Sequence, residues 1–378
     1  MHIKTFGVEM WMNEFENHCR YNLAETCVDS ITLGELIDMA GVDNSVLGEL
    51  RGMRMGYGAI EGSDRLRHAV AGLYENQSRE NVLTTHGTIG ANALVHQTLV
   101  SRGDHVIAIV PTYQQHYSIP ESIGAEVELL HLRPENGFLP DLDELRAMMR
   151  PDTRMIATNN PNNPTGALMD RAMLAELAEI ARGSGAWVLC DEVYRGTDQV
   201  GNGYTASICD LYERGISTAG MSKAYSLAGL RVGWVAGPKT LLEDIMIHRD
   251  YNTISVGRID EYFAALALEN RAQILDRAHR ITRENLAILS DWVEAEPLIS
   301  WVKPQAGTTA LLKYDLPLPS RDFCTQLLEE EGVLFTPGSA MDMESWLRIG
   351  FANSTADLRD GLARVSAFLA RHGAAQSS

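Results

Sequence analysis

Short apolar runs rich in β-branched residues alternate with segments of helical periodicity through the middle of the chain. Such an alternation predicts a mostly parallel sheet with helices on both faces. The expected strands are His105–Val110, Glu126–His131, Met155–Thr158, Trp187–Cys190 and Val232–Ala236. The clearest helix between them is Asp170–Arg182, where Asp170 can cap the start, apolar residues recur at helical spacing, and Gly183 can end the pattern.

The C-terminal part has a different pattern. A helix is expected at Arg321–Glu330, followed by strands at Val333–Thr336 and Trp346–Phe351. The capping-box sequence Ser354–Asp357 then begins a last helix. The apolar face of this helix consists of Leu358, Leu362, Val365 and Leu369. This pattern predicts a smaller α+β domain that the N-terminal segment completes.

These patterns divide the chain into two expected domains. The large α/β domain is residues 46–270, and the small domain consists of residues 1–45 and 271–378. The small, polar tail Gly373–Ser378 is expected to fray.

Composition and charge narrow the choice of partners. The chain has 32 basic and 50 acidic residues, so its formal charge of −18 argues against nucleic acid or an anionic membrane. The first residues lack a signal-peptide pattern, and no apolar run is long enough to cross a membrane. Five scattered cysteines without a C-x-x-C pair fit reduced thiols rather than disulfides or a zinc site. We therefore expect a cytoplasmic protein that binds no metal.

The segment SKAYSLAGLRVGW contains the most informative chemistry. Lys223 can hold an aldehyde as a Schiff base, while Ser222 and Arg231 can bind a phosphate. Pyridoxal phosphate (PLP) has both groups, on opposite sides of one ring. On its own, however, a lysine and an arginine around glycines also fit a solvated loop.

A second segment, Thr85–Gly90, precedes a helical pattern at Ala91–Val100. A glycine-containing turn at a helix start presents free N–H groups and a positive dipole end, which can bind a phosphate. The turn does not match G-x-G-x-x-G, and alone it fits an ordinary strand–helix connection equally well.

Polar residues also follow the expected strands. Asp191 comes directly after a buried strand, where its carboxylate can face a ligand crevice and keep the PLP ring nitrogen protonated, although it could instead cap a helix. The rigid turn Asn159–Gly166 can point an asparagine amide at the PLP 3′-oxygen, or be simple turn chemistry. Tyr113 offers an aromatic face for stacking.

Arg348 lies among apolar residues, where a guanidinium needs either a substrate carboxylate or an internal salt bridge.

Together these segments resemble the class I/II aminotransferases, which belong to the fold type I group of PLP enzymes. The resemblance extends from Tyr57 to Phe351 and includes Tyr57–Gly62 with Leu66-Arg67, NPNNPTG, DEVY, SKxxxxxGLRVG and LRIGF in the family's order. It implies an α/β fold type I PLP-dependent transferase, with a large domain around a mostly parallel sheet and a smaller α+β domain. It also implies PLP as the cofactor and a small amino acid as the substrate.

The resemblance implies roles for individual residues. Lys223 resembles the Schiff-base lysine and proton shuttle, and we expect cationic surroundings to lower its pKa. The other implied contacts are Asp191 to the ring nitrogen, Asn163 and Tyr194 to the 3′-oxygen, Tyr113 to the ring face, and Thr88, the Ile89 backbone, Ser222 and Arg231 to the phosphate. Tyr57 is expected to reach the phosphate of a neighbouring subunit, which implies a homodimer with shared active sites. Arg348 and Asn163 are expected to bind the substrate.

The chain also departs from the family pattern. Gly220 and Gly90 stand where many members have a serine and a longer polar residue, so one phosphate contact is in doubt. The segment Asn22–Cys27 is closer to the LAEN phrase of aminocyclopropane-carboxylate synthases, and Leu33–Asp38 is similar to capreomycidine synthases, which close a ring on a hydroxylated arginine. Both are PLP enzymes that do not transaminate.

Two reaction types therefore remain open. One is elimination and cyclisation of a (hydroxy)arginine-like substrate in secondary metabolism, and this is the interpretation we favour. The other is transfer of the α-amino group to a 2-oxo acid. The N-terminal segment is expected to lie near the substrate, with Ala24, Glu25 and Asp29 close to the distal group of the substrate. An acidic residue there suits a cationic side chain, but could also be a solvated or capping acid.

Overall fold

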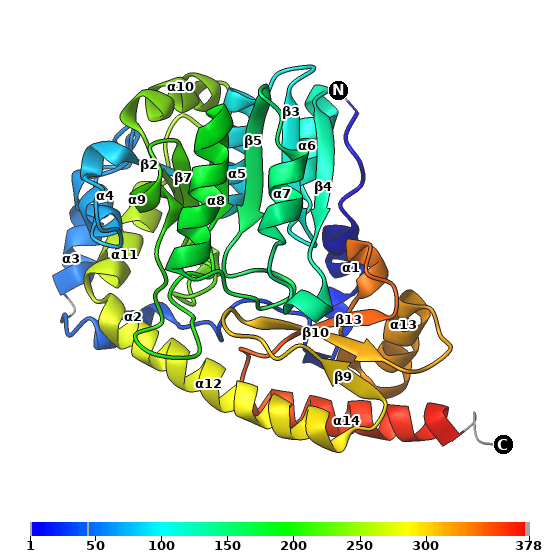
Figure 1. Ribbon diagram of the computed structural model, residues 1–378. Coiled ribbons are helices and arrows are strands. Elements are labelled where there is room, and N and C mark those ends of the chain that lie inside the picture. Colours follow the sequence, from blue (N-terminus) through cyan, green and yellow to red (C-terminus); the bar gives the residue numbers. More distant parts are fainter. Residues whose placement is uncertain (1, 44, 375–378) are drawn as a thin grey trace.

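A computed structural model describes residues 2–43 and 45–374 of the chain. At its centre is a seven-stranded sheet of order β2-β8-β7-β6-β5-β3-β4 (Figure 1). Its strands are β2 (Val82–His86), β3 (His105–Val110), β4 (Glu126–His131), β5 (Thr153–Asn159), β6 (Trp187–Asp191), β7 (Gly215–Gly220) and β8 (Val232–Ala236). All neighbours are parallel except that β8 runs antiparallel to both β2 and β7. The predicted mostly parallel sheet is therefore confirmed.

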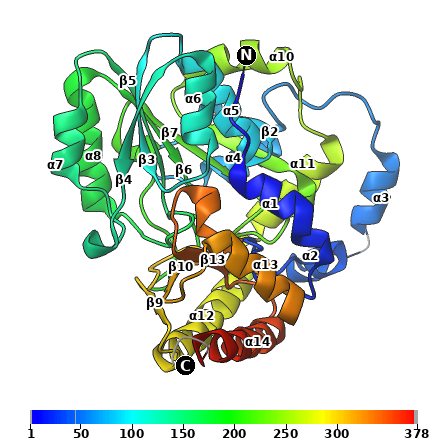
Figure 2. The ribbon, with the colours of Figure 1, turned by 90° about the vertical axis from the view of Figure 1, so that its right-hand side faces the viewer.

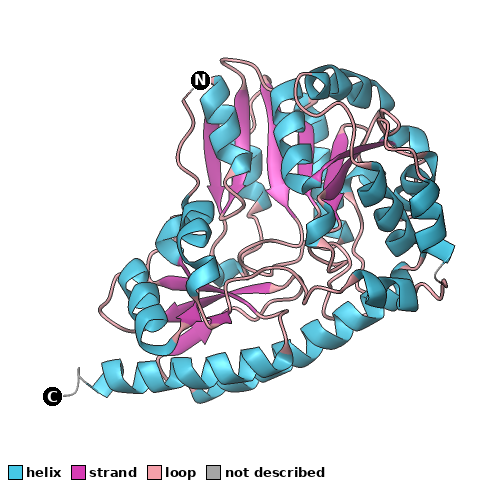
Figure 3. Cartoon of the chain, turned by 180° about the vertical axis from the view of Figure 1, so that it is seen from behind, coloured by secondary structure: helices cyan, strands magenta, loops and turns pink. Residues whose placement is uncertain are grey.

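Helices cover both faces of this sheet because its central strands are apolar on both sides. In β3, Ile107 and Ile109 pack with α8 (Arg171–Ser184), whereas Val106, just before Ile107, packs with α5 (Gly87–Leu99) and α10 (Lys239–Asp250). This is the period-2 alternation of a pleated strand. Figure 3 shows the helices on either side of the sheet.

The five strands predicted for the large sheet all occur, with ends shifted by two residues at most. Asp170 caps α8 as expected, because its side chain accepts a hydrogen bond from the Met173 amide. The predicted stop at Gly183 is wrong. This residue lies inside α8, and Gly185 ends the helix in the left-handed conformation, with φ of 74°.

A second sheet is formed mainly by the C-terminal part. Its antiparallel order is β12-β13-β10-β9, where β9 is Ile299–Trp301, β10 is Thr309–Tyr314, β12 is Thr336–Pro337 and β13 is Trp346–Gly350. The single strand predicted at Val333–Thr336 is wrong, because the chain changes sheets there. β11 (Val333–Leu334) instead pairs in parallel with β1 (Tyr21–Asn22), and this pairing joins the N-terminal segment to the C-terminal part.

The remaining helices complete both parts (Figures 1 and 2). They are α1 (Gly7–Phe15), α2 (Leu33–Met39), α3 (Ser45–Gly52), α4 (Asp64–Ala71), α6 (Gln115–Ile123), α7 (Leu142–Met148), α9 (Ile208–Leu211), α11 (Arg258–Glu269), α12 (Arg271–Ala295), α13 (Ser320–Glu331) and α14 (Thr355–Ala374). α14 begins at the predicted capping box, where the Ser354 hydroxyl accepts from the Asp357 amide. Of the predicted frayed tail, Gly373 belongs to α14 and residues 375–378 lie outside the described residues. The division at residues 46 and 270 stays a prediction. Within the described residues, no helix is both long and apolar enough to cross a membrane.

Candidate active site

A cavity of about 320 Å³ lies between the carboxyl ends of the central strands and the small sheet. Parallel sheets of this kind bind ligands at this edge, where the loops after the strands converge. The cavity brings together nearly all of the predicted site residues. Its lining includes Glu25, Thr88, Ile89, Tyr113, Asn163, Asp191, Tyr194, Ser222, Lys223, Arg231 and Arg348.

Tyr57 does not line this cavity. Its side chain lies in a separate surface hollow with Arg258 and Tyr262, and 81% of the residue is exposed. The Ala24 side chain does not line the cavity either, because it is buried in the core of the C-terminal part. The Ala24 carbonyl, however, accepts a hydrogen bond from Arg348 at 3.2 Å, so the Ala24 backbone borders the site.

Asp191 is the last residue of β6, and its carboxylate is held in one orientation. One oxygen accepts a hydrogen bond from the Asn92 side-chain amide at 2.7 Å, and the other accepts from the Val193 backbone N–H at 3.0 Å. His116 Nε2 lies 3.7 Å from the first oxygen. The buried carboxylate is thus fixed at the floor of the cavity, where it can meet a protonated ring nitrogen.

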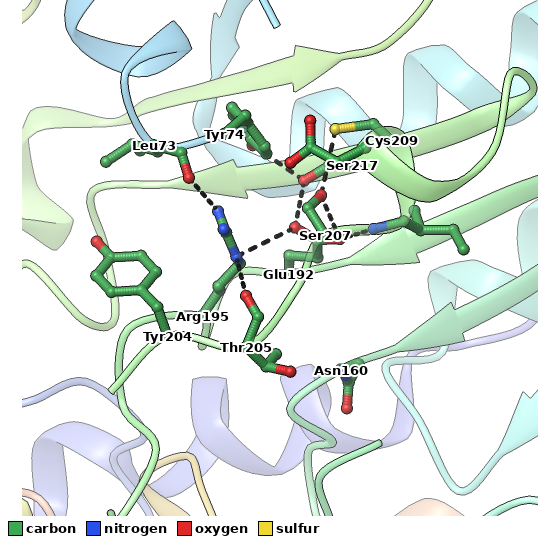
Figure 4. Close-up of polar contacts among 12 residues, drawn as sticks. Leu73, Tyr74, Asn160, Glu192, Arg195, Tyr204, Thr205, Ser207, Cys209 and Ser217 are labelled. Atoms are coloured by element: carbon green, nitrogen blue, oxygen red, sulfur yellow. Dashed lines mark hydrogen bonds and ion pairs between the residues drawn. The ribbon is translucent and has the colours of Figure 1, made fainter. Parts of the chain in front are cut away.

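The neighbouring residue, Glu192, anchors this segment in the protein interior (Figure 4). Its buried carboxylate accepts hydrogen bonds from the Ser207 and Ser217 hydroxyls, both at 2.8 Å, and from the Ile208 N–H at 3.0 Å. Burial raises the pKa of Glu192, while Arg195 and these donors oppose the rise. The network ties the turn after β6 to β7 and α9, so Asp191 and Tyr194 project from a rigid base.

Lys223 follows β7 and directs its amine into the cavity. Nζ donates a hydrogen bond to the Thr26 hydroxyl at 2.6 Å and lies 3.5 Å from the Cys27 sulfur. The expected lowering of its pKa by cationic surroundings is wrong. Burial alone lowers the pKa of the Lys223 ammonium, but Cys27, Tyr194 and the Glu25 carboxylate outweigh burial and raise the pKa above its usual value. In this arrangement the groups nearest the amine are acids or neutral hydroxyls, and not cations.

Cys27 and Tyr194 are protonated neighbours of this lysine. Burial is the main reason that the pKa of the Cys27 thiol is raised, to about 11. Burial likewise raises the pKa of the Tyr194 phenol, although Lys223 and a hydrogen bond with Thr26 oppose the rise. Both groups can therefore act as neutral hydrogen-bond donors at neutral pH, and they raise the pKa of Lys223 as they ionise at higher pH, whereas the Glu25 carboxylate is charged at neutral pH as well.

The start of α5 has the features of a phosphate site. Thr88 and Ile89 belong to the first turn, whose N–H groups have no partners within the helix, and the buried Thr88 hydroxyl has no hydrogen-bond partner among the described residues. Gly87 has φ of +67°, and a Cβ on it would lie 2.8 Å from Arg231 Nη2. Arg231 Nη1 donates to the Ala228 carbonyl at 2.9 Å and lies 3.5 Å from the Ser222 hydroxyl. This cradle of donors fits a phosphate.

The structure gives a physical reason for the glycine at position 220. A Cβ on Gly220 would lie 2.7 Å from the Thr88 hydroxyl oxygen and 2.9 Å from the Val232 carbonyl oxygen. A serine therefore does not fit here unless the start of α5 moves.

Arg348 lies on β13 and is 4% exposed. Its Nη2 donates to the Thr336 hydroxyl at 3.0 Å, and Nη1 lies 3.4 Å from the Asn163 side-chain oxygen. Nε has no partner, and no salt bridge of the described residues includes Arg348. Burial lowers the pKa of the guanidinium, and nearby acidic groups only partly offset this effect. A buried cation paired only with neutral oxygens suits an anionic ligand group.

The acidic residues of the N-terminal segment separate into two environments. Glu25 lines the cavity, and one of its oxygens accepts from the Thr26 and Cys27 backbone N–H groups at 2.6 and 2.8 Å. Burial raises the pKa of Glu25, but Lys223 and these donors lower it below its usual range. Asp29 does not line the cavity; its carboxylate accepts from Arg277 at 2.8 Å.

Sequence reasoning missed several residues that line or support the site, among them Asn92, Thr26, Cys27 and Glu9. Asn92 is one helical turn beyond Thr88, so its position on the same face of α5 could have been predicted. Thr26 and Cys27 directly follow Glu25, in the N-terminal segment that the sequence predicts to lie near the substrate. Glu9 lines the cavity, but no local pattern distinguishes it, because its place depends on how α1 packs.

Comparison with known proteins identifies the family. A model of the aminotransferase class I and II family matches residues 43–365. The chain belongs to this family. It is therefore an enzyme, its cofactor is PLP, and its fold is the fold type I arrangement of PLP-dependent aminotransferases.

Individual relatives include both aminotransferases and a cyclase. Capreomycidine synthase from Streptomyces vinaceus is 34% identical over 97% of this chain and 94% of its own length. The crystal structure of a PLP-dependent aminotransferase from Streptococcus suis has a TM-score of 0.95 and 44% identity, covering 98% of this chain and 99% of that one. The PLP-dependent cyclase OrfR has a TM-score of 0.90 and 26% identity, covering 98% of both chains.

Proposed function

We propose that this enzyme acts at the Cα of an α-amino acid held between Arg348 and Lys223. The observation that carries the proposal is the buried Arg348 guanidinium, which has no salt-bridge partner among the described residues and lines the same cavity as the lysine amine. A guanidinium can bind a substrate carboxylate through two parallel hydrogen bonds. This contact would place the substrate amine and Cα toward Lys223.

The residues around the cavity fit PLP group by group. Thr88, Ile89, Ser222 and Arg231 would hold its phosphate, Asp191 its ring nitrogen, Asn163 and Tyr194 its 3′-oxygen, and Tyr113 its ring face. When bound, PLP supplies an electron sink for the pair that remains when a bond to Cα is broken. The carboxylate of Asp191, fixed by Asn92 and Val193, would keep the ring nitrogen protonated and so strengthen that sink.

Lys223 is the group that would move the Cα proton. Its Nζ points into the cavity beside the Thr26 hydroxyl, which can accept a hydrogen bond from the amine and orient it. A lysine that takes a proton must first be neutral. Because Glu25 helps to raise the pKa of Lys223, the charge around Glu25 affects how readily the amine becomes a base.

The reaction type that we favour is elimination and cyclisation of a (hydroxy)arginine-like amino acid in secondary metabolism, as in capreomycidine synthase. The 34% identity to capreomycidine synthase over nearly the whole chain supports this choice, as does the structural similarity to a PLP-dependent cyclase. The Glu25 carboxylate at the cavity also suits a substrate with a distal cation. The alternative is an amino-acid aminotransferase, which the 44% identity to a structure described as an aminotransferase favours.

Following the substrate nitrogen separates the two reactions. The PLP-loaded enzyme is incubated with α-¹⁵N-labelled arginine and with its β-hydroxylated form, each with and without a 2-oxo acid. For a cyclase, turnover needs no 2-oxo acid, and the label stays in the cyclic product. Appearance of the label in a second amino acid, only when the 2-oxo acid is present, would establish the aminotransferase instead. Lys223→Ala is the control, with turnover expected to fall by roughly 10²–10⁴-fold.

We also propose a homodimer with shared active sites. The support is Tyr57, an aromatic side chain that is 81% exposed and does not line the cavity of its own chain. An exposed tyrosine of this kind fits a contact with a second copy. Light scattering of the PLP-loaded enzyme tests the oligomeric state. If the enzyme is a dimer with shared sites, Tyr57→Phe should weaken its affinity for PLP while the molar mass of the assembly stays that of a dimer. A wild-type enzyme that is monomeric in solution would refute the shared site.

A further inference from the structure

Helix α1 lies where the two parts of the molecule meet (Figure 2), and two of its residues, Val8 and Glu9, line the cavity. On the side of the large sheet, the Gly7 N–H donates to the Gln114 side-chain oxygen at 2.8 Å, and Gln114 Nε2 donates to the Thr5 carbonyl at 2.9 Å. On the other side, the Trp11 indole N–H donates to the Phe335 carbonyl at 2.8 Å. These contacts fix the position of Glu9, which lies on α1 between them and lines the cavity.

The Glu9 carboxylate accepts a hydrogen bond from one side chain, Tyr113. The Tyr113 hydroxyl donates to its Oε1 at 2.7 Å, and burial is the main reason that the pKa of Tyr113 is raised, so the phenol stays protonated as the donor. Tyr113 itself packs against Phe6, with ring centroids 4.6 Å apart. Glu9 is therefore oriented by a fixed aromatic residue and keeps further acceptor positions for a ligand.

Two other carboxyl groups lie close to Glu9. The pKa of Glu16 is raised first by burial and then by the negative charges of Glu25 and Glu9. No salt bridge of the described residues includes any of these three. Glu25 is already engaged, because one oxygen accepts two backbone N–H groups and Lys223 lies nearby. Acidic groups gathered at a cavity repel one another unless a cation joins them.

A second observation at the cavity points to a charged ligand. Arg348, 4% exposed, lines the same cavity with an unpartnered Nε. The cavity thus has the buried Arg348 guanidinium available for an anionic group and the Glu9 carboxylate available for a cationic group. A basic α-amino acid has both charges in one molecule, with its carboxylate and its side-chain cation at opposite ends.

We propose that Glu9 is a specificity-determining residue that binds the distal cation, guanidinium or ammonium, of a basic amino-acid substrate. This inference rests on the proposed function, because it takes the α-carboxylate to be bound by Arg348. Tyr113 would act as a positioning residue for Glu9, while Glu16 and Glu25 add negative potential nearby. Glu9 belongs to a helix at the edge of the cavity, so it can select the side chain without taking part in chemistry at Cα.

Binding of matched amino acids tests this role. L-arginine and L-citrulline have nearly the same shape, but only arginine is charged at the distal end. Each is titrated into the PLP-loaded enzyme, and the change in cofactor absorbance gives a dissociation constant. We expect wild type to prefer arginine, and Glu9→Gln to lose tenfold or more of that preference while its affinity for citrulline changes little. The matched control is Glu14→Gln on the exposed side of the same helix, which should retain the wild-type preference.

The outcomes separate failure of this inference from failure of the proposed function. If Glu9→Gln retains the full preference for arginine, Glu9 does not bind the distal cation. If wild type binds both amino acids equally, the substrate is not selected by charge, but action on α-amino acids stands. If no amino acid changes the absorbance of the wild-type enzyme, the proposed function fails and this inference falls with it. Thermal unfolding of each variant confirms that the compared proteins are folded.

Discussion

The side-chain amide of Asn92 donates a hydrogen bond to the Asp191 carboxylate at 2.7 Å. Asn92 lies on α5 and Asp191 at the end of β6, so the bond joins the helix of the proposed phosphate site to the proposed partner of the ring nitrogen. The amide is itself oriented, because its oxygen accepts a hydrogen bond from the Thr218 hydroxyl at 2.6 Å. The same three residues thus connect α5, β6 and β7 beneath the cavity.

Removing this amide should weaken cofactor binding more than it weakens the fold. A hydrogen bond to a charged group contributes about 1.5–3 kcal/mol. In Asn92→Leu we therefore expect PLP to bind about tenfold more weakly, as measured by fluorescence titration. Thr218→Val, which removes only the group that orients the amide, should have a smaller effect in the same direction. Unchanged PLP affinity in Asn92→Leu would show that Val193 and His116 suffice to hold Asp191.

Arg348 should distinguish a carboxylate from its neutral amide. Truncating one partner of a buried charge pair costs about 2–5 kcal/mol, so Arg348→Gln should weaken binding of the amino-acid substrate by roughly 30-fold or more. Titration with the α-carboxamide of the same amino acid provides the control, because the amide cannot form the ion pair. Wild type should discriminate between acid and amide, and the variant should not. Equal discrimination in both proteins would assign the carboxylate to another residue.

Two glycines provide a matched pair of substitutions at the proposed phosphate site. At Gly220 a Cβ would lie 2.7 Å from the Thr88 hydroxyl oxygen, whereas at Gly90 the nearest atom would be 3.9 Å away. We expect Gly220→Ser to lower the free energy of unfolding by about 1–3 kcal/mol and to weaken PLP binding. Gly90→Ser should fold normally. Chemical denaturation of both variants gives the comparison, and a fully stable Gly220→Ser would show that the start of α5 moves easily.

Asp198 should make stability depend on pH. Burial raises the pKa of its carboxyl to about 7, although Arg195 opposes the rise. Because the unfolded pKa is near 3.9, the folded state retains a proton that the unfolded state has lost between about pH 4 and 7. The free energy of unfolding should therefore fall as pH rises through this range, by a few kcal/mol, and level off above it.

Asp198→Asn removes this titration. The variant should be more stable than wild type at pH 8, and its stability should vary less between pH 4 and 7. Urea denaturation at a series of pH values measures both quantities. Parallel pH profiles for the two proteins would show that Asp198 does not retain its proton in the folded state.

One strand of the large sheet could not be predicted because its buried side chains are largely small or polar. β7, Gly215–Gly220, has the sequence GISTAG and lacks the apolar pattern of a buried strand. Its polar side chains are satisfied by partners far along the chain, since Ser217 donates to Glu192 and Thr218 to Asn92. Local periodicity detects burial only when the buried side chains are apolar.

The sequence by itself determined the strand–helix alternation, the family and the residues suited to PLP, because those residues follow strands in short motifs of fixed spacing. Only the tertiary structure decided which distant residues surround them. Packing of α1 against Gln114 and Phe335 places Glu9 at the cavity, and the turn at Thr26 and Cys27 meets Lys223 almost two hundred positions away. The tertiary structure likewise decided the direction of the Lys223 pKa shift, because that direction depends on which charged groups are packed near the Lys223 amine.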